Sequence, residues 1–378
     1  MSEQDDELSI PEAAPEYDVM EPWANDGPPP LGEWREDILG PAYESQTIPL
    51  IPDEEGDASA VLVRYSAHRD PDASQEAKAF PSFIALYLHG RNDYFFQTQL
   101  AQTMAEAGCA FYALDLRKYG RSLRPWQQIG YVDDLSVYDE EIGEALSIMH
   151  AEQGHLPLIL IGHSTGGLIA TLWAHRHPGA VAGLILNSPW LEMHTMANLR
   201  PVAQPILGRI ASRNPKWEVP SGSGLDFYGR SLLYGRQASE LPIPDGISED
   251  DPVVTGWGYV RAWKRPESYP IPAAWLDAIM AGHETIEKDV HLTCPVLSMT
   301  STTSYFESEW CEKVFTSDIV LDVEIIRERS SRLADQVTIA RFPGKHDLFL
   351  SDPDVREKVY DTMKRWIDAF VAQVCSLS

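Results

Sequence analysis

The sequence predicts an α/β protein built on a mostly parallel, doubly wound sheet. From Ser82 onward, short runs of aliphatic residues alternate with longer stretches of helical period. The apolar runs are FIALYL (83–88), AFYALDL (110–116), LPLILIG (156–162), AGLILN (182–187), PVLSM (295–299) and QVTIARF (336–342). Continuous apolar strands separated by helices are typical of a parallel sheet that is covered on both faces.

Two of the intervening stretches carry the stripe of an amphipathic helix. In residues 133–154 and again in residues 353–374, apolar side chains recur at steps of three and four. The stripes consist of Leu135, Tyr138, Ile142, Leu146 and Met149, and of Val355, Val359, Met363, Trp366, Ile367 and Phe370. Pro353 suits the first position of the second helix, where its missing N–H has no cost.

The remaining segments suggest one domain with an insertion. Residues 47–52 (TIPLIP) and 60–67 (AVLVRYSA) predict an antiparallel hairpin at the edge of the sheet. The stretch 191–290 is rich in Gly, Pro, Trp and Tyr and lacks the strand–helix alternation, which resumes after it. We therefore expect an acidic tail (1–30), the first part of the core (31–190), a lid or cap insertion (191–290) and the second part of the core (291–378).

The charge of the chain narrows the classes of partner. Its 378 residues have a net charge of −27, which disfavours binding to nucleic acid and to anionic membranes. The first thirty residues contain acids and prolines but neither Lys nor Arg, so they are predicted to be a disordered tail. The sequence does not set the oligomeric state.

The sequence also predicts a cytoplasmic protein without cofactor or metal. It has no basic and apolar leader at its start and no apolar run long enough to cross a bilayer. The four cysteines have no paired spacing, so we interpret them as reduced thiols that form neither a disulfide framework nor a zinc site. They are Cys109, Cys294, Cys311 and Cys375.

The sharpest motif is Gly162-His163-Ser164-Thr165-Gly166, between a buried strand and a predicted helix. In this strand–turn–helix setting the serine adopts a strained backbone, and only small residues two positions before and after it avoid a clash. The alternative is a glycine-rich turn with an incidental serine. We predict Ser164 to be a nucleophile.

A serine nucleophile needs a base, and His346 is the best placed of eleven histidines. It lies in the loop Pro343-Gly344-Lys345-His346-Asp347, after the last apolar run, at the sheet edge where sites collect in open α/β folds. A surface histidine is the alternative.

Two backbone amides are candidates for an oxyanion hole. The N–H of Thr165 begins the helix after the nucleophile, and the N–H of Arg91 lies in the loop Leu88-His89-Gly90-Arg91-Asn92-Asp93 after the first apolar run. A plain turn at the end of a strand is the alternative for this loop.

Four segments in this order, LHGRNDYF, DLRKYGRS, IGHSTGG and GKHDLF, resemble the α/β-hydrolase fold serine hydrolases of the monoacylglycerol lipase, lysophospholipase and serine-aminopeptidase-like group. The resemblance covers roughly 31–190 and 291–378. It implies Ser164 as nucleophile, His346 as base, an oxyanion hole of the Arg91 and Thr165 amides, and a lid at the irregular insertion. Lys118 stands where the group usually has glycine.

The third member of the expected triad departs from the group. An acid usually follows the strand that reads CPVLSM here, but the residues after it, TSTTSY (300–305), contain no carboxylate. The base needs an anion, so the acid must come from another segment. The later run SDIVLDVE (317–324) resembles the group's usual D-x-x-V-D step into the next helix, displaced by an insertion at about 301–317, and this resemblance implies Asp318 as the acid. Asp322 would then cap the next helix. Asp322 itself, Glu307 or another acid remain alternatives for the triad.

These residues predict catalysis through an acyl-enzyme intermediate, and the resemblance implies that the substrates are carboxylic esters of small molecules. A peptidase, amidase or acyltransferase on the same triad is an alternative, with Glu192 or Glu307 as an amine-binding carboxylate. A catalytically silent binding protein is a third possibility. The aromatic residues of the insertion either line a substrate pocket or pack the insertion on the core.

Overall fold

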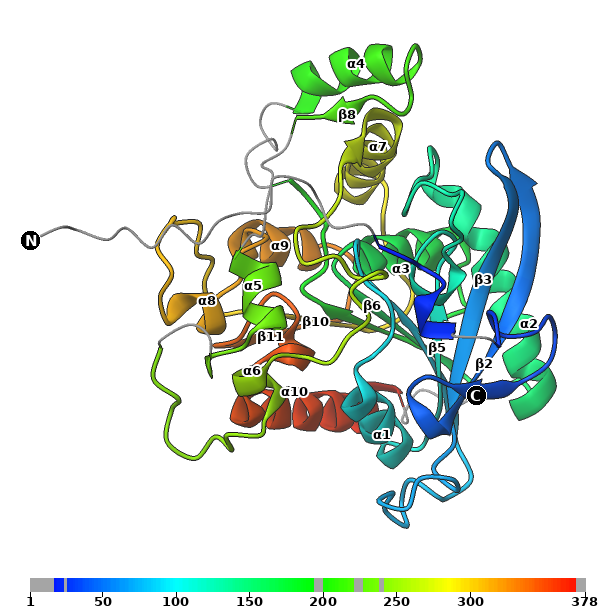
Figure 1. Ribbon diagram of the computed structural model, residues 1–378, viewed down its shortest axis with the longest axis vertical. Coiled ribbons are helices and arrows are strands. Elements are labelled where there is room, and N and C mark those ends of the chain that lie inside the picture. The colour runs from blue at the N-terminus through cyan, green and yellow to red at the C-terminus, as the bar shows by residue number, and fades with distance from the viewer. Residues whose placement is uncertain (1–16, 24–25, 194–199, 221–226, 238–240, 372–378) are drawn as a thin grey trace, which may run out of the picture.

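The computed structural model describes residues 17–23, 26–193, 200–220, 227–237 and 241–371 (Figure 1). A nine-stranded sheet has the order β1-β2-β3-β5-β4-β6-β7-β10-β11. Its strands are β1 (Arg35–Asp37), β2 (Gly40–Asp53), β3 (Gly56–Tyr65), β4 (Phe83–Leu88), β5 (Cys109–Asp115), β6 (Leu158–His163), β7 (Gly183–Asn187), β10 (Val296–Ser301) and β11 (Val337–Phe342).

The sheet confirms the predicted α/β class. The six apolar runs form β5, β4, β6, β7, β10 and β11, and neighbouring strands within this set are parallel. β2 and β3 form the predicted antiparallel hairpin, and β3 joins the sheet antiparallel to β5. The short β1, which has no apolar run of its own, lies outside the hairpin.

Side chains alternate between two apolar cores along the central strands. In β4, Ile84 and Leu86 enter one core while Ala85 and Tyr87 enter the other. The helices α2 (Tyr138–Gln153), α3 (Thr165–Arg176) and α7 (Ala273–Lys288) contribute to the first core. The helices α1 (Thr98–Glu106) and α10 (Pro353–Trp366) contribute to the second. Both faces of the sheet are therefore covered, as continuous apolar strands require.

The chain between β7 and β10 contains mostly short elements. They are α4 (Arg200–Ala211), β8 (Glu218–Val219), α5 (Phe227–Leu233), α6 (Pro252–Thr255), β9 (Ile271–Pro272) and α7. The helix α7 packs against α4 on one side and α3 on the other. After β10 come α8 (Lys313–Thr316) and α9 (Val323–Ser330).

Part of the predicted tail folds against the body, which corrects the expectation for those residues. Trp23 is only 5% exposed, and its ring lies 5.1 Å from that of Trp263. The indole Nε1 of Trp263 donates to the carbonyl oxygen of Val19 at 2.9 Å. Although the tail is acidic in composition, the side chains of Val19 and Trp23 are buried in the apolar core, and this burial stabilises the position of the segment. Residues 1–16 lie outside the described residues.

The DLRKYGRS segment forms a buried ionic centre behind the loop that follows β4. Arg121 is fully buried and pairs with Asp37 at 2.7 Å and with Asp115 at 2.9 Å. Asp115 also accepts a hydrogen bond from the amide of Phe95 at 2.9 Å. Because each of these charges has a partner, the cluster links β1, β5 and the loop after β4 without an uncompensated buried charge.

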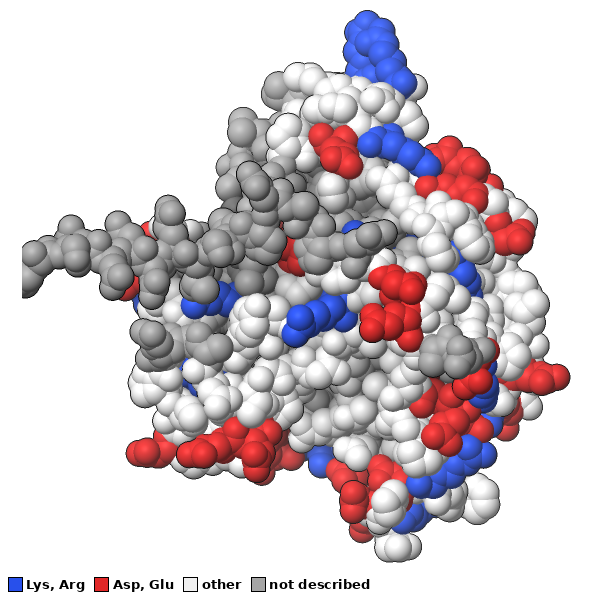
Figure 2. Space-filling view, viewed as in Figure 1, with Lys and Arg blue, Asp and Glu red and all other residues white. Residues whose placement is uncertain are grey.

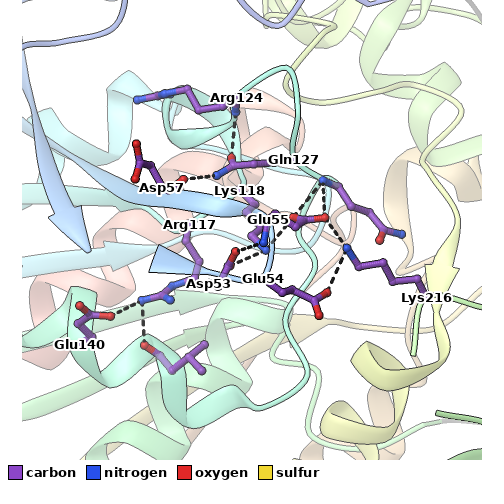
Figure 3. A network of polar contacts seen from close by, with 12 residues as sticks. Asp53, Glu54, Glu55, Asp57, Arg117, Lys118, Arg124, Gln127, Glu140 and Lys216 are labelled. Atoms are coloured by element: carbon purple, nitrogen blue, oxygen red, sulfur yellow. Dashed lines mark hydrogen bonds and ion pairs between the residues drawn. The ribbon is translucent and has the colours of Figure 1, made fainter. Parts of the chain in front are cut away.

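Lys118, the departure from the group's usual glycine, takes part in a second ionic network (Figure 3). Its backbone has φ of +63°, a left-handed conformation that ordinarily favours glycine. Its Nζ lies 2.7 Å from Asp53 and 2.8 Å from Glu55, both at the β2–β3 turn. Lys216, between α4 and β8, pairs with Glu55 at 2.7 Å. The side chain of Lys118 thus connects the loop after β5 to the β2–β3 turn, which glycine could not do, and Lys216 connects the same turn to the chain between β7 and β10.

Acidic side chains gather along the lower edge of the face shown in Figure 2, in keeping with the net charge of −27. Among the helices that the structure describes, none combines the length and apolar character needed to span a bilayer.

The contact between Trp23 and Trp263 leads to a stability prediction. Trp23→Ala removes a large buried side chain, so the free energy of unfolding should fall by about 3 kcal/mol. Chemical denaturation measures this change. Glu21→Ala, at an exposed position in the same turn, should change stability by less than about 0.5 kcal/mol. If the two variants unfold alike, the contact does not stabilise the protein.

Candidate active site

Ser164 occupies a crowded bend between β6 and α3. Its φ is +51°, in the left-handed region that is rare for residues other than glycine. A Cβ on Gly162 would lie 2.5 Å from the carbonyl oxygen of Gly166, and one on Gly166 would lie 2.3 Å from the carbonyl oxygens of Leu88 and His89. The two glycines are therefore required sterically, and they hold the serine beside the loop that follows β4.

His346 and Asp318 are hydrogen-bonded to each other. The Nδ1 of His346 lies 2.8 Å from Oδ2 of Asp318, whose side chain is fully buried. The other oxygen of Asp318 accepts from the amides of Val320 and Leu321, both at 2.8 Å. His346 and Ser164 line the same cavity. With Nδ1 engaged by the carboxylate, Nε2 is the ring nitrogen left for a proton from the serine.

The insertion after β10 explains how an acid so far along the chain reaches this place. Ser304 and Asp318 form an isolated β-bridge, with the amide of Asp318 donating to the carbonyl oxygen of Thr303 at 2.9 Å. Residues 305–317 thus leave the sheet edge and return to it. Within this excursion Val314 and Phe315 are buried in a small satellite core that includes Val253 and Val254 of α6.

The other candidate acids lie elsewhere. Asp322 caps α9, because its Oδ1 accepts from the amides of Glu324 at 3.0 Å and Ile325 at 3.4 Å. This is the capping role expected for an aspartate at that position. Glu307 is exposed and does not line the cavity.

Arg91 and Thr165, the predicted oxyanion donors, both line the cavity with Ser164. Thr165 is the first residue of α3, where a backbone N–H has no acceptor within the helix. A Cβ on Gly90 would lie 3.1 Å from Cβ of Ser164, so the loop that carries Arg91 passes directly beside the serine. Backbone donors on two sides of a serine are the arrangement that stabilises a tetrahedral oxyanion.

The cavity has a volume of about 310 Å³ and a mainly apolar wall from the chain between β7 and β10. Tyr228 lies edge-on to His346, with ring centroids 5.7 Å apart. Of the aromatic residues described in that chain, Trp190, Tyr228 and Tyr259 line the cavity. Trp263 and Trp275 are instead buried in the core, so aromatic content alone did not distinguish lining from packing.

A buried polar cluster lies beside the triad candidates. Asp93, His163 and Asp347 each offer one ligand atom within 4.8 Å of the others, a spacing that could hold a metal ion. Lys264, however, donates to Asp93 at 2.9 Å, while Gln97 and Asn187 donate to Asp347 at 3.0 and 2.7 Å. These donors supply a cation and hydrogen bonds to both carboxylates, so a metal is not needed to account for the cluster.

Sequence reasoning did not assign Asp93, Asp347 or Lys264 to the site. Asp93 and Asp347 belong to the motif segments, but only the fold shows that they meet. Burial lowers the pKa of His163, the residue before Ser164. Its centroid is 4.9 Å from that of His346.

Lys345, next to His346, has a side chain that is buried against α5. Its Nζ donates to the carbonyl oxygen of Ser231 in α5 at 3.2 Å. Burial lowers its pKa to about 7; Asp352 opposes that shift, and Arg236 and Arg356 add to it.

A class of protein now follows from the fold and the site. The sheet order, the strained serine at the β6–α3 bend and the histidine after β11 define an α/β hydrolase. The model of the serine aminopeptidase S33 family matches residues 81–302, and the chain belongs to this family.

A monoacylglycerol lipase from Mycolicibacterium smegmatis is 30% identical over 71% of this chain and 81% of its own length. Two solved structures share the fold. A monoglyceride lipase from Saccharomyces cerevisiae, crystallised as a soluble variant, has a TM-score of 0.56 at 17% identity, over 86% of this chain and 96% of its own. A carboxyl esterase from Bacillus coagulans has a TM-score of 0.55 at 17% identity, over 86% of this chain and 99% of its own. The chain is thus a lipase- or esterase-like α/β hydrolase.

The lowered pKa of Lys345 predicts a specific pH dependence of stability. Its folded pKa of about 7 lies below the ordinary value of 10.5, so between these values the unfolded chain binds one more proton. This group therefore makes the folded state more stable as pH rises through that range, by about tenfold in the unfolding equilibrium per pH unit.

Lys345→Met removes this contribution. Its stability relative to wild type should be greatest at pH 7 and should decline steadily toward pH 10, as measured by denaturant titrations. Lys358→Met, at an exposed position of α10, should show no such trend. A stability difference for Lys345→Met that is constant with pH contradicts a lowered pKa.

Proposed function

We propose that this chain hydrolyses carboxylic esters of small molecules, with Ser164 as nucleophile, His346 as base and Asp318 as the acid of a triad. The observation that carries the proposal is the 2.8 Å hydrogen bond between the buried Asp318 and His346, which lines a cavity together with the strained Ser164. A histidine held by a buried aspartate in the same cavity as a serine supports a Ser-His-Asp triad.

In the proposed reaction, His346 Nε2 takes the proton of Ser164 Oγ as that oxygen attacks the ester carbonyl carbon. The amides of Arg91 and Thr165 hold the negative oxygen of the tetrahedral intermediate. His346 then returns the proton to the leaving alcohol, and the acyl group remains on Ser164. Water, activated by the same histidine, releases the acid and restores the serine.

The wall of the cavity supports an ester with an apolar acyl group. Trp190, Leu232 and Ile271 line it together with Tyr228 and Tyr259, and apolar walls with a few polar groups are typical of small-molecule sites. The similarity to a monoacylglycerol lipase favours an acylglycerol among such esters. We further propose that residues 191–290 serve as the lid over this cavity.

The charges in the site favour esters over peptides. An aminopeptidase needs a carboxylate for the substrate's ammonium group, but Lys264 neutralises Asp93, the carboxylate among the described lining residues. Glu192 pairs with Arg329 at 3.0 Å and does not line the cavity.

The nucleophile can be tested with a fluorophosphonate probe and with p-nitrophenyl esters of graded chain length. Wild type should become labelled on Ser164 and should hydrolyse the esters, whereas Ser164→Ala should do neither. Aminoacyl anilides should be poor substrates. A wild-type protein that neither reacts with the probe nor cleaves any ester would support a binding protein on this fold.

The acid can be tested by a pair of matched substitutions. Asp318→Asn should lower kcat by about 10²- to 10⁴-fold, because the base loses its anion. Asp322→Asn should leave kcat near wild type, since asparagine also caps helices well. Steady-state kinetics and melting temperatures separate catalysis from stability. The assignment of Asp318 is wrong if the two variants exchange these behaviours.

A further inference from the structure

Three consecutive residues of the loop after β4 bind one stretch of the chain between β7 and β10. We call this stretch, residues 259–270, the wall segment. Arg91 donates from Nη1 to Oγ of Ser268 at 3.0 Å and from Nη2 to the carbonyl oxygen of Tyr269 at 2.5 Å. Its guanidinium also lies 4.1 Å from the centroid of the Tyr269 ring.

Asn92 makes a two-way hydrogen bond with the same segment. Its Nδ2 donates to the carbonyl oxygen of Arg265 and its Oδ1 accepts from the amide of Arg265, both at 2.8 Å. Its own amide donates to the hydroxyl of Tyr269 at 3.2 Å. The third residue, Asp93, accepts from Lys264 at 2.9 Å.

The wall segment is itself fixed to the body of the protein. The amide of Val260 donates to the hydroxyl of Tyr94 at 2.7 Å. Trp263 is fully buried between the rings of Trp23 and Tyr94, at centroid distances of 5.1 and 5.3 Å. The hydrogen bonds from Arg91 and Asn92 therefore end on a segment that is anchored by buried aromatic contacts.

The backbone conformation of Asn92 affects the orientation of the preceding residue, Arg91. Its φ of +54° is left-handed, which is unfavourable for a residue other than glycine unless the surroundings enforce it. Both polar atoms of its side chain are used by Arg265, which holds this conformation. Asn92 directly follows Arg91 in the chain. The side-chain contacts of both residues therefore restrict the backbone that carries the N–H of Arg91.

We propose that the wall segment positions the oxyanion hole, with Asn92 as the positioning residue that holds the amide of Arg91 toward the reacting carbonyl. This inference rests on the proposed ester hydrolysis. Preorganised donors are worth about 10²- to 10³-fold in kcat each, and a small displacement of a reacting group can cost about 10²-fold. The wall segment thus acts in the transition state and does more than enclose substrate.

Asn92→Gly separates the two roles of this residue, because glycine adopts the left-handed backbone freely but lacks the side-chain hydrogen bonds. We expect kcat for p-nitrophenyl butyrate to fall about 10- to 100-fold with little change in KM, and the rate of Ser164 phosphonylation to fall in parallel. Asn214→Gly, the same substitution at an exposed position before β8, should behave like wild type.

Two further measurements keep the test decisive. Hydrogen exchange in residues 88–96 should become faster in Asn92→Gly, which reports the loss of position without any substrate. Tyr269→Phe leaves Asn92 in place but removes the wall-segment hydroxyl that accepts from the Asn92 amide. It should also lower kcat, by about tenfold. It replaces Asn92→Gly as the test if the glycine variant does not fold.

The outcomes distinguish this inference from the proposed function. Wild-type kcat in a folded Asn92→Gly, or a loss of kcat that follows entirely from a lower melting temperature, overturns the positioning role while leaving ester hydrolysis intact. A wild-type protein without probe labelling or esterase activity overturns the proposed function. In that case the exchange measurement alone decides, and unchanged exchange in residues 88–96 overturns the positioning role as well.

Discussion

The close packing of the start of α3 against the end of β4 is the constraint on which the site depends. A Cβ on Gly166 would lie 2.3 Å from the carbonyl oxygens of Leu88 and His89. The helix therefore approaches the end of the strand as closely as backbone atoms allow. This approach holds Ser164 in its left-handed conformation. It also brings the loop after β4, with Arg91, beside the serine. One steric requirement thus unites the candidate nucleophile with its candidate oxyanion donors.

Local patterns predicted much of the architecture. The six parallel strands and the hairpin follow from apolar runs, and α2 and α10 follow from stripes at helical spacing. The elbow at Ser164 could be predicted because its glycines act on neighbouring atoms. The place of Asp318 could be inferred because residues 317–324 resemble the group's D-x-x-V-D step into the next helix, although the acid does not directly follow the strand. Here the structure brings Asp318 to His346 and leaves Asp322 as the cap.

What the sequence could not reveal are contacts between segments without periodicity. Trp23 was placed in a disordered tail by its acidic neighbours, because composition does not show which surface can bury an indole. The pairing of Lys118 and Lys216 with the β2–β3 turn, and that of Arg91 with Ser268 and Tyr269, join residues about 60 to 180 positions apart. Such pairs are set by the fold, and a single sequence carries no signal for them.

The chain between β7 and β10 contacts both loops that carry the proposed catalytic groups. On one side the wall segment binds Arg91, Asn92 and Asp93. On the other, Tyr228 of α5 lies against His346, and Ser231 accepts from Lys345. Under the proposed function, the chain that encloses the substrate also aligns the reacting groups. Changes in the insertion should affect turnover as well as the choice of substrate.

The central claim is that Ser164, His346, Asp318 and the two amides act on one reacting centre. A crystal structure of the protein after reaction with an alkyl fluorophosphonate tests it most directly. The account predicts phosphorus bonded to Oγ of Ser164, with one phosphonyl oxygen about 2.7–3.1 Å from the amide nitrogens of both Arg91 and Thr165. An adduct on a different residue, or a phosphonyl oxygen that points away from both amides, would contradict it.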